Sequence, residues 1–175
     1  MAFGISINAR GEDAQLLRNF WNLFSRFEHS PSMAQLNYPP HLTLAAYDTI
    51  DELQLRRTLE AAFSGQSTFQ LRFERIGIFT EPQLVFWADP APSIALQRAH
   101  MAIHELIDPA LCREHYRPGI WVPHSTIALQ VRAENREQAT ALAACEFAPF
   151  DVVFDTVCCA EFLPVRVIEE YRLSK

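Results

Sequence analysis

Pro40-His41-Leu42-Thr43-Leu44-Ala45 lies in the first third of the chain, and Pro123-His124-Ser125-Thr126-Ile127-Ala128 repeats its proline, histidine, threonine and alanine in the same places. The two histidines are 83 positions apart (124 − 41) in a chain of 175 residues, which is close to half its length. A pattern that returns once per half predicts a duplicated architecture in which each half contributes one histidine.

Both hexapeptides are expected to begin strands. A proline fixes its own φ and biases the preceding residue to extended geometry, so the start of each strand is well defined. Side chains two positions apart on a strand share a face. His41 and Thr43 therefore point the same way, as do His124 and Thr126, and each motif presents an imidazole beside a hydroxyl.

The apolar spacing around the two motifs predicts elements in the order β-α-β-α-β-β-α-β-α-β-β. The expected strands are 3–8, 41–47, 69–79, 84–88, 124–131, 150–162 and 165–173, and the expected helices are 13–27, 51–63, 94–107 and 133–145. Each motif strand is followed by a helix and a hairpin. This arrangement predicts an α+β fold with two pseudo-symmetric lobes of antiparallel sheet, outer helices and a central cleft. No linker separates the lobes, so residues 1–175 are expected to form a single bilobal domain.

Charge and composition narrow the partners and the compartment. The formal net charge of −6 argues against a long nucleic-acid footprint, which needs a basic face, but allows a small phosphate ligand in a cleft. No apolar run approaches the length of a membrane span, and no signal peptide is recognisable at the N-terminus. We therefore expect a cytoplasmic protein without a membrane partner. The cysteines lack zinc-site spacing and are expected to be reduced, mostly buried thiols: Cys112, Cys145, Cys158 and Cys159.

Two histidines that face one cleft suit general acid–base catalysis. An imidazole ordinarily titrates near neutrality, so one ring can accept a proton from the attacking group while the other delivers a proton to the leaving oxygen. The hydroxyls of Thr43 and Thr126 can donate to the non-bridging oxygens of a phosphate held between them. This scheme requires no metal ion, no cofactor and no protein nucleophile.

Other readings of the same residues are open. A single His-x-Thr on a strand carries little information, and the function rests on the pairing of His41 with His124; the two would lie far apart if the repeat were a coincidence. A nucleotide- or RNA-binding module without turnover would also keep this cleft. His100 and His104 are four apart on a helix, which is zinc-binding geometry, but Met101 stands where a metalloprotease has glutamate. We expect these two histidines to form a polar flank of that helix.

The paired motifs resemble those of the two-histidine (2H) phosphoesterase superfamily, in particular its 2′-5′ RNA ligase and cyclic phosphodiesterase-like branches. That family has two copies of His-x-Thr/Ser followed by a hydrophobic residue, in a two-lobed, LigT-like α+β fold. The likeness covers most of the chain, because residues 73–79 and 84–87 also resemble the hairpin between the family's motifs, and the helix around Leu96 and His100 resembles the one that follows.

The resemblance implies phosphoesterase activity on 2′,3′-cyclic or 2′-5′-linked phosphodiesters of nucleotides or short RNA ends. His41 and His124 would be the catalytic pair, with His124 as base and His41 as acid in hydrolysis, although a pseudo-symmetric site can run either way. Thr43 and Thr126 would bind the phosphate. Candidates for stacking on a base, or for lining the rim, are Phe79, Tyr47, Trp87, Tyr116 and Trp121. One chain supplies both motifs, and a monomer is expected.

One departure from the family pattern concerns ligation. Many ligase-type members carry an arginine a few residues after the second His-x-Thr, where this chain has Ala128, Leu129 and Gln130. Together with the acidic net charge, this favours a small nucleotide substrate and leaves 2′-5′ RNA ligation as an alternative. Arg75 and Arg117 are the candidates for the missing positive charge.

Overall fold

The computed structural model describes residues 2–162 and 164–174. The strands within them are β1 (Ala2–Asn8), β2 (His41–Tyr47), β3 (Phe69–Phe79), β4 (Val85–Pro90), β5 (Ser125–Ala128), β6 (Phe150–Phe154), β7 (Thr156–Phe162) and β8 (Arg166–Arg172). The α-helices are α1 (Ala14–Ser25), α2 (Glu52–Phe63), α3 (Ile94–Leu106) and α4 (Arg136–Ala143). The predicted order of elements is confirmed, with one additional strand.

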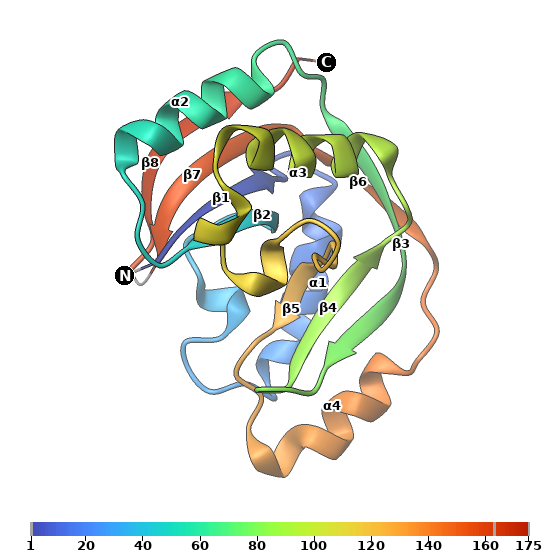
Figure 1. Cartoon of the computed structure of the whole chain (residues 1–175). Coiled ribbons are helices and arrows are strands. Elements are labelled where there is room, and N and C mark those ends of the chain that lie inside the picture. Colours follow the sequence, from blue (N-terminus) through green and yellow to red (C-terminus); the bar gives the residue numbers. More distant parts are fainter. Residues whose placement is uncertain (1, 163, 175) are drawn as a thin grey trace.

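The strands form two antiparallel four-stranded sheets (Figure 1). The first sheet has the order β2-β1-β7-β8, and the second has the order β5-β4-β3-β6. The strand of each motif is therefore at one edge of its own sheet, beside a central strand that precedes it in the chain. This equivalence confirms the predicted α+β fold with two lobes related by an internal repeat.

The helices are exchanged between the lobes. Helix α1 connects β1 to β2 in the first sheet, yet it packs against β5 and β6 of the second sheet. Helix α3 connects β4 to β5 in the second sheet, yet it packs against β2 of the first. Helix α2 lies beside α3 and covers β7 and β8 (Figure 1). Each motif strand is thus supported by a helix from the other half of the chain.

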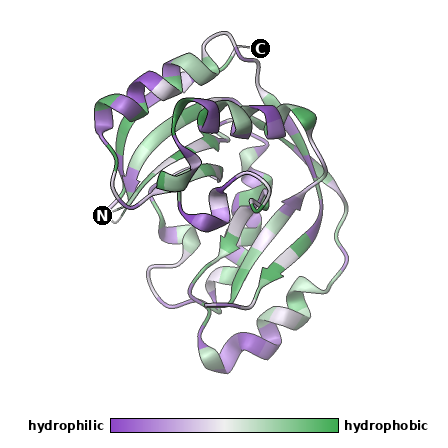
Figure 2. Cartoon of the chain, viewed as in Figure 1, coloured by the Kyte–Doolittle hydropathy of each residue, from purple (hydrophilic) through white to green (hydrophobic). Residues whose placement is uncertain are grey.

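The alternation predicted for the motif strands explains how they join the core. Leu42, Leu44 and Ile127 are fully buried, whereas His41 and Thr43 on the opposite face are only half-buried. Burial of three such side chains contributes several kcal/mol, on the order of 2 kcal/mol each. Hydrophobic residues predominate in the strands, whereas hydrophilic and hydrophobic residues alternate along the helices (Figure 2). No helix among the described residues is both long and apolar enough to cross a membrane.

The single strand predicted for 150–162 is wrong, because the chain changes sheets at Asp155. Strand β6 pairs with β3 in the second sheet, whereas β7 pairs with β1 and β8 in the first. The backbone N–H of Asp155 donates to the carbonyl of Asn8 (3.1 Å), and the carbonyl of Asp155 accepts from the N–H of Leu173 (2.9 Å). At Asp155 these hydrogen bonds to remote residues take the place of pairing within one strand. The apolar pattern of the sequence runs through this residue without interruption, so it does not reveal the change of sheet.

The second motif strand is shorter than the predicted 124–131, and His124 lies immediately before it. After Ala128 the backbone leaves the sheet. The N–H of Leu129 donates to the Glu28 carboxylate, and Val131 forms an isolated bridge with Glu28. The helix predicted for 133–145 begins as a 3₁₀ turn at Ala133–Asn135 and continues as α4.

Candidate active site

The two motifs are brought together at the junction of the lobes. Strands β2 and β5 contact each other although their sequences are far apart. His41 is the first residue of β2 and His124 immediately precedes β5, and both imidazoles are half-buried. Burial is the main cause that lowers the pKa of His41, and the charge of His124 lowers it further, so the two rings lie within electrostatic range of each other. The reading of the repeat as a coincidence, which required the histidines to lie far apart, is not supported.

Each imidazole is fixed in the same tautomer by a local hydrogen bond. Nδ1 of His41 lies 2.9 Å from the carbonyl oxygen of Pro39, and Nδ1 of His124 lies 2.7 Å from that of Val122. A carbonyl oxygen only accepts hydrogen bonds, so Nδ1 carries the proton in both rings. A neutral imidazole held in this way has its lone pair on Nε2, which is the atom available for proton transfer.

Burial shifts both histidines towards their neutral form in the free protein. Burial lowers the pKa of His41, with a further lowering by His124, and the hydrogen bond to Pro39 opposes this only in part. Burial also lowers the pKa of His124 against the opposing bond to Val122. A bound phosphate anion would favour the protonated form of whichever ring lies nearest to it. The arrangement can therefore supply one base and, with an anionic ligand present, one acid.

The threonines lie on the same face as the histidines. Thr43 pairs with Ser6 of β1, and Thr126 pairs with Trp87 of β4, in equivalent positions of the two sheets. Both threonine side chains are half-buried. Burial raises the pKa of the Tyr116 hydroxyl, and a hydrogen bond with Thr43 opposes that rise, which places Tyr116 beside the first motif.

An aromatic pair surrounds the second histidine. The Phe79 and Trp87 rings are stacked, with centroids 4.9 Å apart, and their centroids lie 5.3 and 5.9 Å from that of His124. Trp87 is buried and Phe79 is half-buried. Gly77 faces Trp87 across the hairpin, and a Cβ at this position would overlap the indole ring. Of the predicted stacking residues, Phe79 has the best position to receive a base.

The remaining stacking candidates lie in different surroundings. The Trp121 ring is parallel to His100, with centroids 4.1 Å apart, and its Nε1 donates to the carbonyl of Thr43 (3.1 Å). Trp121 therefore packs against the back of the first motif with one face already covered. Tyr47 is fully buried in the core. A ring with no exposed surface offers no face to a base, and this placement disfavours a stacking role for Tyr47.

Tyr38 is a site residue that sequence reasoning missed. Its ring meets His41 edge to face, with centroids 4.9 Å apart. Its hydroxyl lies 2.7 Å from Sγ of Cys158 and 3.0 Å from Oγ of Ser6, and it accepts from Nδ2 of Asn8 (3.2 Å). All of these groups are buried. The only signal in the sequence is the position of Tyr38 three residues before His41. The two lobes therefore differ chemically, with a buried polar cluster beside His41 and an aromatic pair beside His124.

One buried carboxylate connects the flanks of the two motifs. Glu28 is only 5% exposed, and its two oxygens accept from the backbone N–H groups of Met33 (3.1 Å) and Leu129 (2.9 Å). Met33 precedes His41 by eight residues, and Leu129 follows Thr126 by three. Burial raises the pKa of Glu28, and these backbone hydrogen bonds oppose the rise. The carboxylate thus ties the chain before His41 to the chain after Thr126.

His100 and His104 are not the polar flank that the sequence predicts. They are only 3% and 7% exposed, and Nε2 of each lies within 3.0 Å of the carbonyl oxygen of Tyr116. Through these hydrogen bonds the two histidines hold the segment that leads into the second motif. In the part of the chain that the structure describes, no three His, Cys, Asp or Glu residues gather closely enough to hold a metal ion. Three of the cysteines are buried as predicted, Cys145 is exposed, and all four are free.

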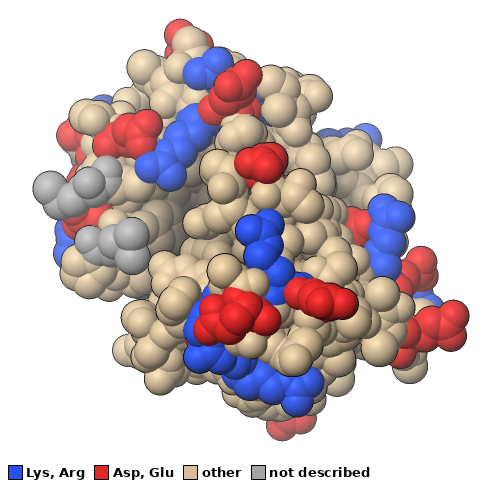
Figure 3. All heavy atoms as spheres, turned by 90° about the horizontal axis from the view of Figure 1, so that it is seen from below, with Lys and Arg blue, Asp and Glu red and all other residues tan. Residues whose placement is uncertain are grey.

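The two candidates for the missing positive charge, Arg117 and Arg75, are both engaged with groups other than the motif histidines. Arg117 donates to the carbonyls of Cys112 (2.8 Å) and Ala110 (3.2 Å) and so holds its own loop. Arg75 is ion-paired with Asp89, and its side chain is largely exposed. On the face shown in Figure 3, arginines lie next to acidic side chains rather than in a field of one sign. This pattern suits a ligand with few phosphates better than a long polyanion.

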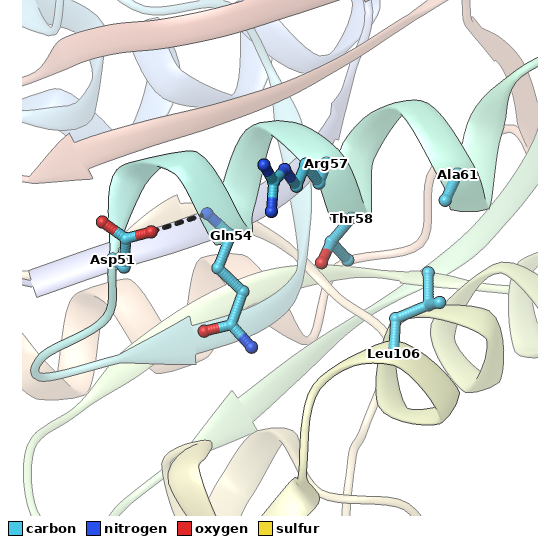
Figure 4. A pocket seen from close by; sticks show the side chains of 6 residues that line it. All are labelled: Asp51, Gln54, Arg57, Thr58, Ala61 and Leu106. Atoms are coloured by element: carbon cyan, nitrogen blue, oxygen red, sulfur yellow. Dashed lines mark hydrogen bonds between the residues drawn. The ribbon is translucent and has the colours of Figure 1, made fainter.

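Two open surface pockets lie outside this constellation. One, of about 410 Å³, is lined by Arg26, Phe27, Asn135 and Gln138. The other, of about 430 Å³, lies between α2 and α3 and is lined by Asp51, Gln54, Arg57, Thr58, Ala61 and Leu106 (Figure 4). Neither contains a motif residue. The candidate site therefore rests on the convergence of the two motifs, and not on the volume of a pocket.

Comparison with known proteins identifies a family whose pattern covers most of the chain. The model of the 2′-5′ RNA ligase superfamily matches residues 15–163. No curated protein matches the chain.

Solved structures extend the likeness to both lobes. E. coli LigT complexed with NADP+ is 15% identical with a TM-score of 0.63, covering 99% of this chain and 97% of LigT. E. coli LigT complexed with 3′-AMP is 16% identical with a TM-score of 0.64, covering 99% and 98%. TT0787 of Thermus thermophilus is 18% identical with a TM-score of 0.62, covering 99% and 98%. These similarities show a shared fold.

Proposed function

The chain belongs to the 2′-5′ RNA ligase superfamily of two-histidine phosphoesterases, and from this membership we propose that it is a metal-independent phosphoesterase acting on 2′,3′-cyclic or 2′-5′-linked phosphodiesters of nucleotides or RNA ends. One observation carries the proposal. His41 and His124 reach the junction of the lobes from opposite halves of the chain, and each has Nδ1 bonded to a carbonyl and Nε2 left for proton transfer.

Hydrolysis of a cyclic phosphate would proceed by two proton transfers. Nε2 of His124 accepts a proton from water as the water oxygen attacks phosphorus. The bond from phosphorus to one ribose oxygen breaks, and protonated Nε2 of His41 gives its proton to that oxygen. The product is a phosphomonoester with one free ribose hydroxyl. The pair then exchanges its proton with solvent before the next turnover. Both transfers use side chains of this chain, so no metal ion or cofactor is needed.

The threonines would act on the charge that develops at phosphorus. Thr43 and Thr126 lie two residues after their histidines, on the same face of β2 and β5. A hydroxyl from each side of the phosphate can donate to its non-bridging oxygens. Donors that are already in place when negative charge builds up lower the barrier, by roughly 3 kcal/mol for a well-placed donor in other enzymes.

A small nucleotide is the substrate that these surroundings favour. The half-buried ring of Phe79 beside His124 can receive a base, whereas the two candidate arginines are engaged elsewhere, Arg117 with a carbonyl and Arg75 with a carboxylate. The LigT structures complexed with 3′-AMP and NADP+ motivate nucleotides as first probes. Both motifs come from one chain, so we propose that residues 1–175 act as a single bilobal domain and as a monomer.

Two alternatives use the same site. In 2′-5′ ligation a 5′-hydroxyl takes the place of water: its oxygen attacks the 2′,3′-cyclic phosphate and gives its proton to one histidine, while the other histidine protonates the departing 3′-oxygen. This reaction agrees with the name of the superfamily. A binding module would hold a nucleotide between the same threonines without turning it over. The presence of both His and Thr in each motif favours catalysis, because a module that only binds a nucleotide does not need an intact acid–base pair.

The proposal is tested with 2′,3′-cyclic AMP in the presence of EDTA. We expect the wild-type protein to release an adenosine monophosphate and His41→Ala and His124→Ala each to abolish the reaction. His115→Ala, at an exposed histidine of the 3₁₀ turn Glu114–Tyr116, serves as a matched control and should be active. Full activity of either motif variant would exclude the acid–base pair. Tight binding of 3′-AMP with no turnover across cyclic and 2′-5′-linked substrates would instead support the binding module.

A further inference from the structure

The motif strands need hydrogen-bond donors from outside their sheets. β2 and β5 are edge strands, and an edge strand has backbone groups that no neighbouring strand pairs. In each of them the carbonyl oxygen of the motif threonine accepts a hydrogen bond from an indole. Nε1 of Trp121 donates to the carbonyl of Thr43 (3.1 Å), and Nε1 of Trp21 donates to the carbonyl of Thr126 (2.8 Å).

The two donors are exchanged between the halves of the chain. Trp21 lies on α1, which connects strands of the first sheet but packs against β5 of the second. Trp121 lies on the segment that follows α3, and α3 packs against β2 of the first sheet. Each motif threonine is therefore held by a tryptophan from the half that carries the other motif.

Both indoles are themselves held in place. Trp21 is 2% exposed, and the guanidinium of Arg18 lies over its ring at 5.5 Å. Trp121 is stacked on His100 with an interplanar angle of 1°, and His100 donates in turn to the carbonyl of Tyr116 (2.8 Å). A donor whose ring cannot turn fixes the position of its acceptor more closely than a mobile side chain does.

From this geometry we infer that Trp21 and Trp121 are reciprocal positioning residues, and that they set the separation between the two threonine hydroxyls. The inference rests on the proposed function, in which both hydroxyls bind one phosphate. Because each tryptophan belongs to one half and holds the motif of the other, the pair couples the lobes across the phosphate. A displacement of about 1 Å in such a site can reduce the rate by roughly a hundredfold.

A crossed set of double variants tests the inference. Trp21→Phe and Trp121→Phe remove the indole N–H and keep an aromatic ring. Each is combined with Thr43→Ala and with Thr126→Ala, and kcat for 2′,3′-cyclic AMP is measured in every combination. Thermal unfolding of each variant shows that the protein is folded at the assay temperature. Residues that act through one another give non-additive effects, whereas independent residues give additive ones.

We expect each tryptophan to depend only on the threonine whose carbonyl it bonds, Trp121 on Thr43 and Trp21 on Thr126. Trp121→Phe should lower kcat about tenfold in the wild-type and Thr126→Ala backgrounds, and less than about twofold in the Thr43→Ala background. Trp21→Phe should show the opposite pattern, with its effect lost only in the Thr126→Ala background. Additive losses in all backgrounds of an active enzyme would mean that the tryptophans serve only general stability, and would overturn the inference.

A second readout separates this inference from the proposed function. If the wild-type protein does not turn over the cyclic nucleotide, the proposed hydrolysis fails, and the same crossed set is measured by the Kd of inorganic phosphate. The inference then stands if the crossed pattern appears in phosphate affinity, and it is overturned if the losses in affinity are additive or if the wild-type protein binds no phosphate.

Discussion

The Phe79 ring stacks on Trp87 with centroids 4.9 Å apart and an interplanar angle of 22°, and both rings meet His124 at steep angles. Among the described residues, no stacked aromatic pair meets His41. Its ring contacts Tyr38, whose hydroxyl belongs to a buried polar cluster with Ser6 and Cys158. The internal repeat therefore generates two similar lobes with different chemistry. A ligand that carries a base at one end and a phosphate in the middle would be oriented by this difference.

Phe79→Leu should weaken binding of a substrate that carries a base. Stacking of one base on an aromatic ring is worth roughly 1–3 kcal/mol, so KM for 2′,3′-cyclic AMP should rise at least about fivefold while kcat changes little. Steady-state kinetics measure both constants. Phe20→Leu, the same substitution at a half-buried ring of α1 that packs against Phe150, is the matched control. An unchanged KM in Phe79→Leu would show that the base lies elsewhere.

The pH profile of kcat/KM should have its maximum on the acidic side of the ordinary imidazole value of 6.5. Burial lowers the pKa of His41 and of His124 in the free protein. The acidic limb reports the base becoming protonated, and the basic limb reports the acid losing its proton, so both limbs lie below 6.5 when both pKa values are lowered. The profile of kcat should lie at higher pH, because bound phosphate favours a protonated imidazole. A kcat/KM maximum on the alkaline side of 6.5 would contradict the lowered values.

The assignment of His41 as the acid predicts a dependence on the leaving group. General acid catalysis typically contributes roughly 10²- to 10⁴-fold when a poor leaving group must be protonated. His41→Ala should therefore lose far more activity on 2′,3′-cyclic AMP than on a 4-nitrophenyl phosphodiester, whose phenolate leaves without a proton. His124→Ala should lose activity on both substrates. The opposite pattern would exchange the two roles.

Burial should make His100 a source of acid sensitivity. Burial lowers the pKa of His100 from 6.5 to about 4, against an opposing hydrogen bond to the Tyr116 carbonyl, so the folded protein binds fewer protons than the unfolded chain between these values. The stabilising contribution is complete above pH 6.5 and is lost as the pH falls towards 4, which amounts to roughly 3 kcal/mol.

Chemical denaturation at several pH values measures this effect. His100→Gln keeps an N–H donor but cannot titrate, so its free energy of unfolding should fall less steeply between pH 6.5 and 4 than that of the wild-type protein. His115→Gln, at an exposed position of the 3₁₀ turn Glu114–Tyr116, should retain the wild-type slope. Equal slopes for all three proteins would mean that His100 does not contribute to the acid sensitivity. Some slope should remain in His100→Gln, because burial also lowers the pKa of His104, whose ring lies 4.6 Å from His100, and those of His41 and His124.

Local sequence patterns predicted much of this fold. The bounds of β2 and β3 follow from a proline-defined start and from strict alternation, and Ser93 caps α3 by accepting from the N–H of Leu96. The pairing of the two motifs followed from their repetition within one chain. These features depend on residues that are close together in the sequence, or on a pattern that occurs twice.

The features that sequence patterns missed depend on tertiary contacts. Asp155 divides one apolar run between two sheets because its backbone bonds to Asn8 and Leu173, which are remote in the sequence. His100 and His104 can be buried because the carbonyl oxygen of Tyr116, in a later segment, accepts a hydrogen bond from each of them. Tyr38 becomes part of the site because β1 and β7 bring Ser6 and Cys158 beneath it. The spacing of residues along the sequence does not reveal such partners, because only the folded chain brings them together.

The proposed site is tested most directly by asking whether one phosphate reaches both histidines. The imidazole ¹⁵N signals of the labelled wild-type protein are followed by NMR as inorganic phosphate is added, with His41→Gln and His124→Gln used for assignment. We expect that the Nε2 signals of His41 and His124 both shift, that a single Kd describes both, and that their Nδ1 nitrogens stay protonated throughout. Two different Kd values, or a response confined to one histidine, would contradict a shared site.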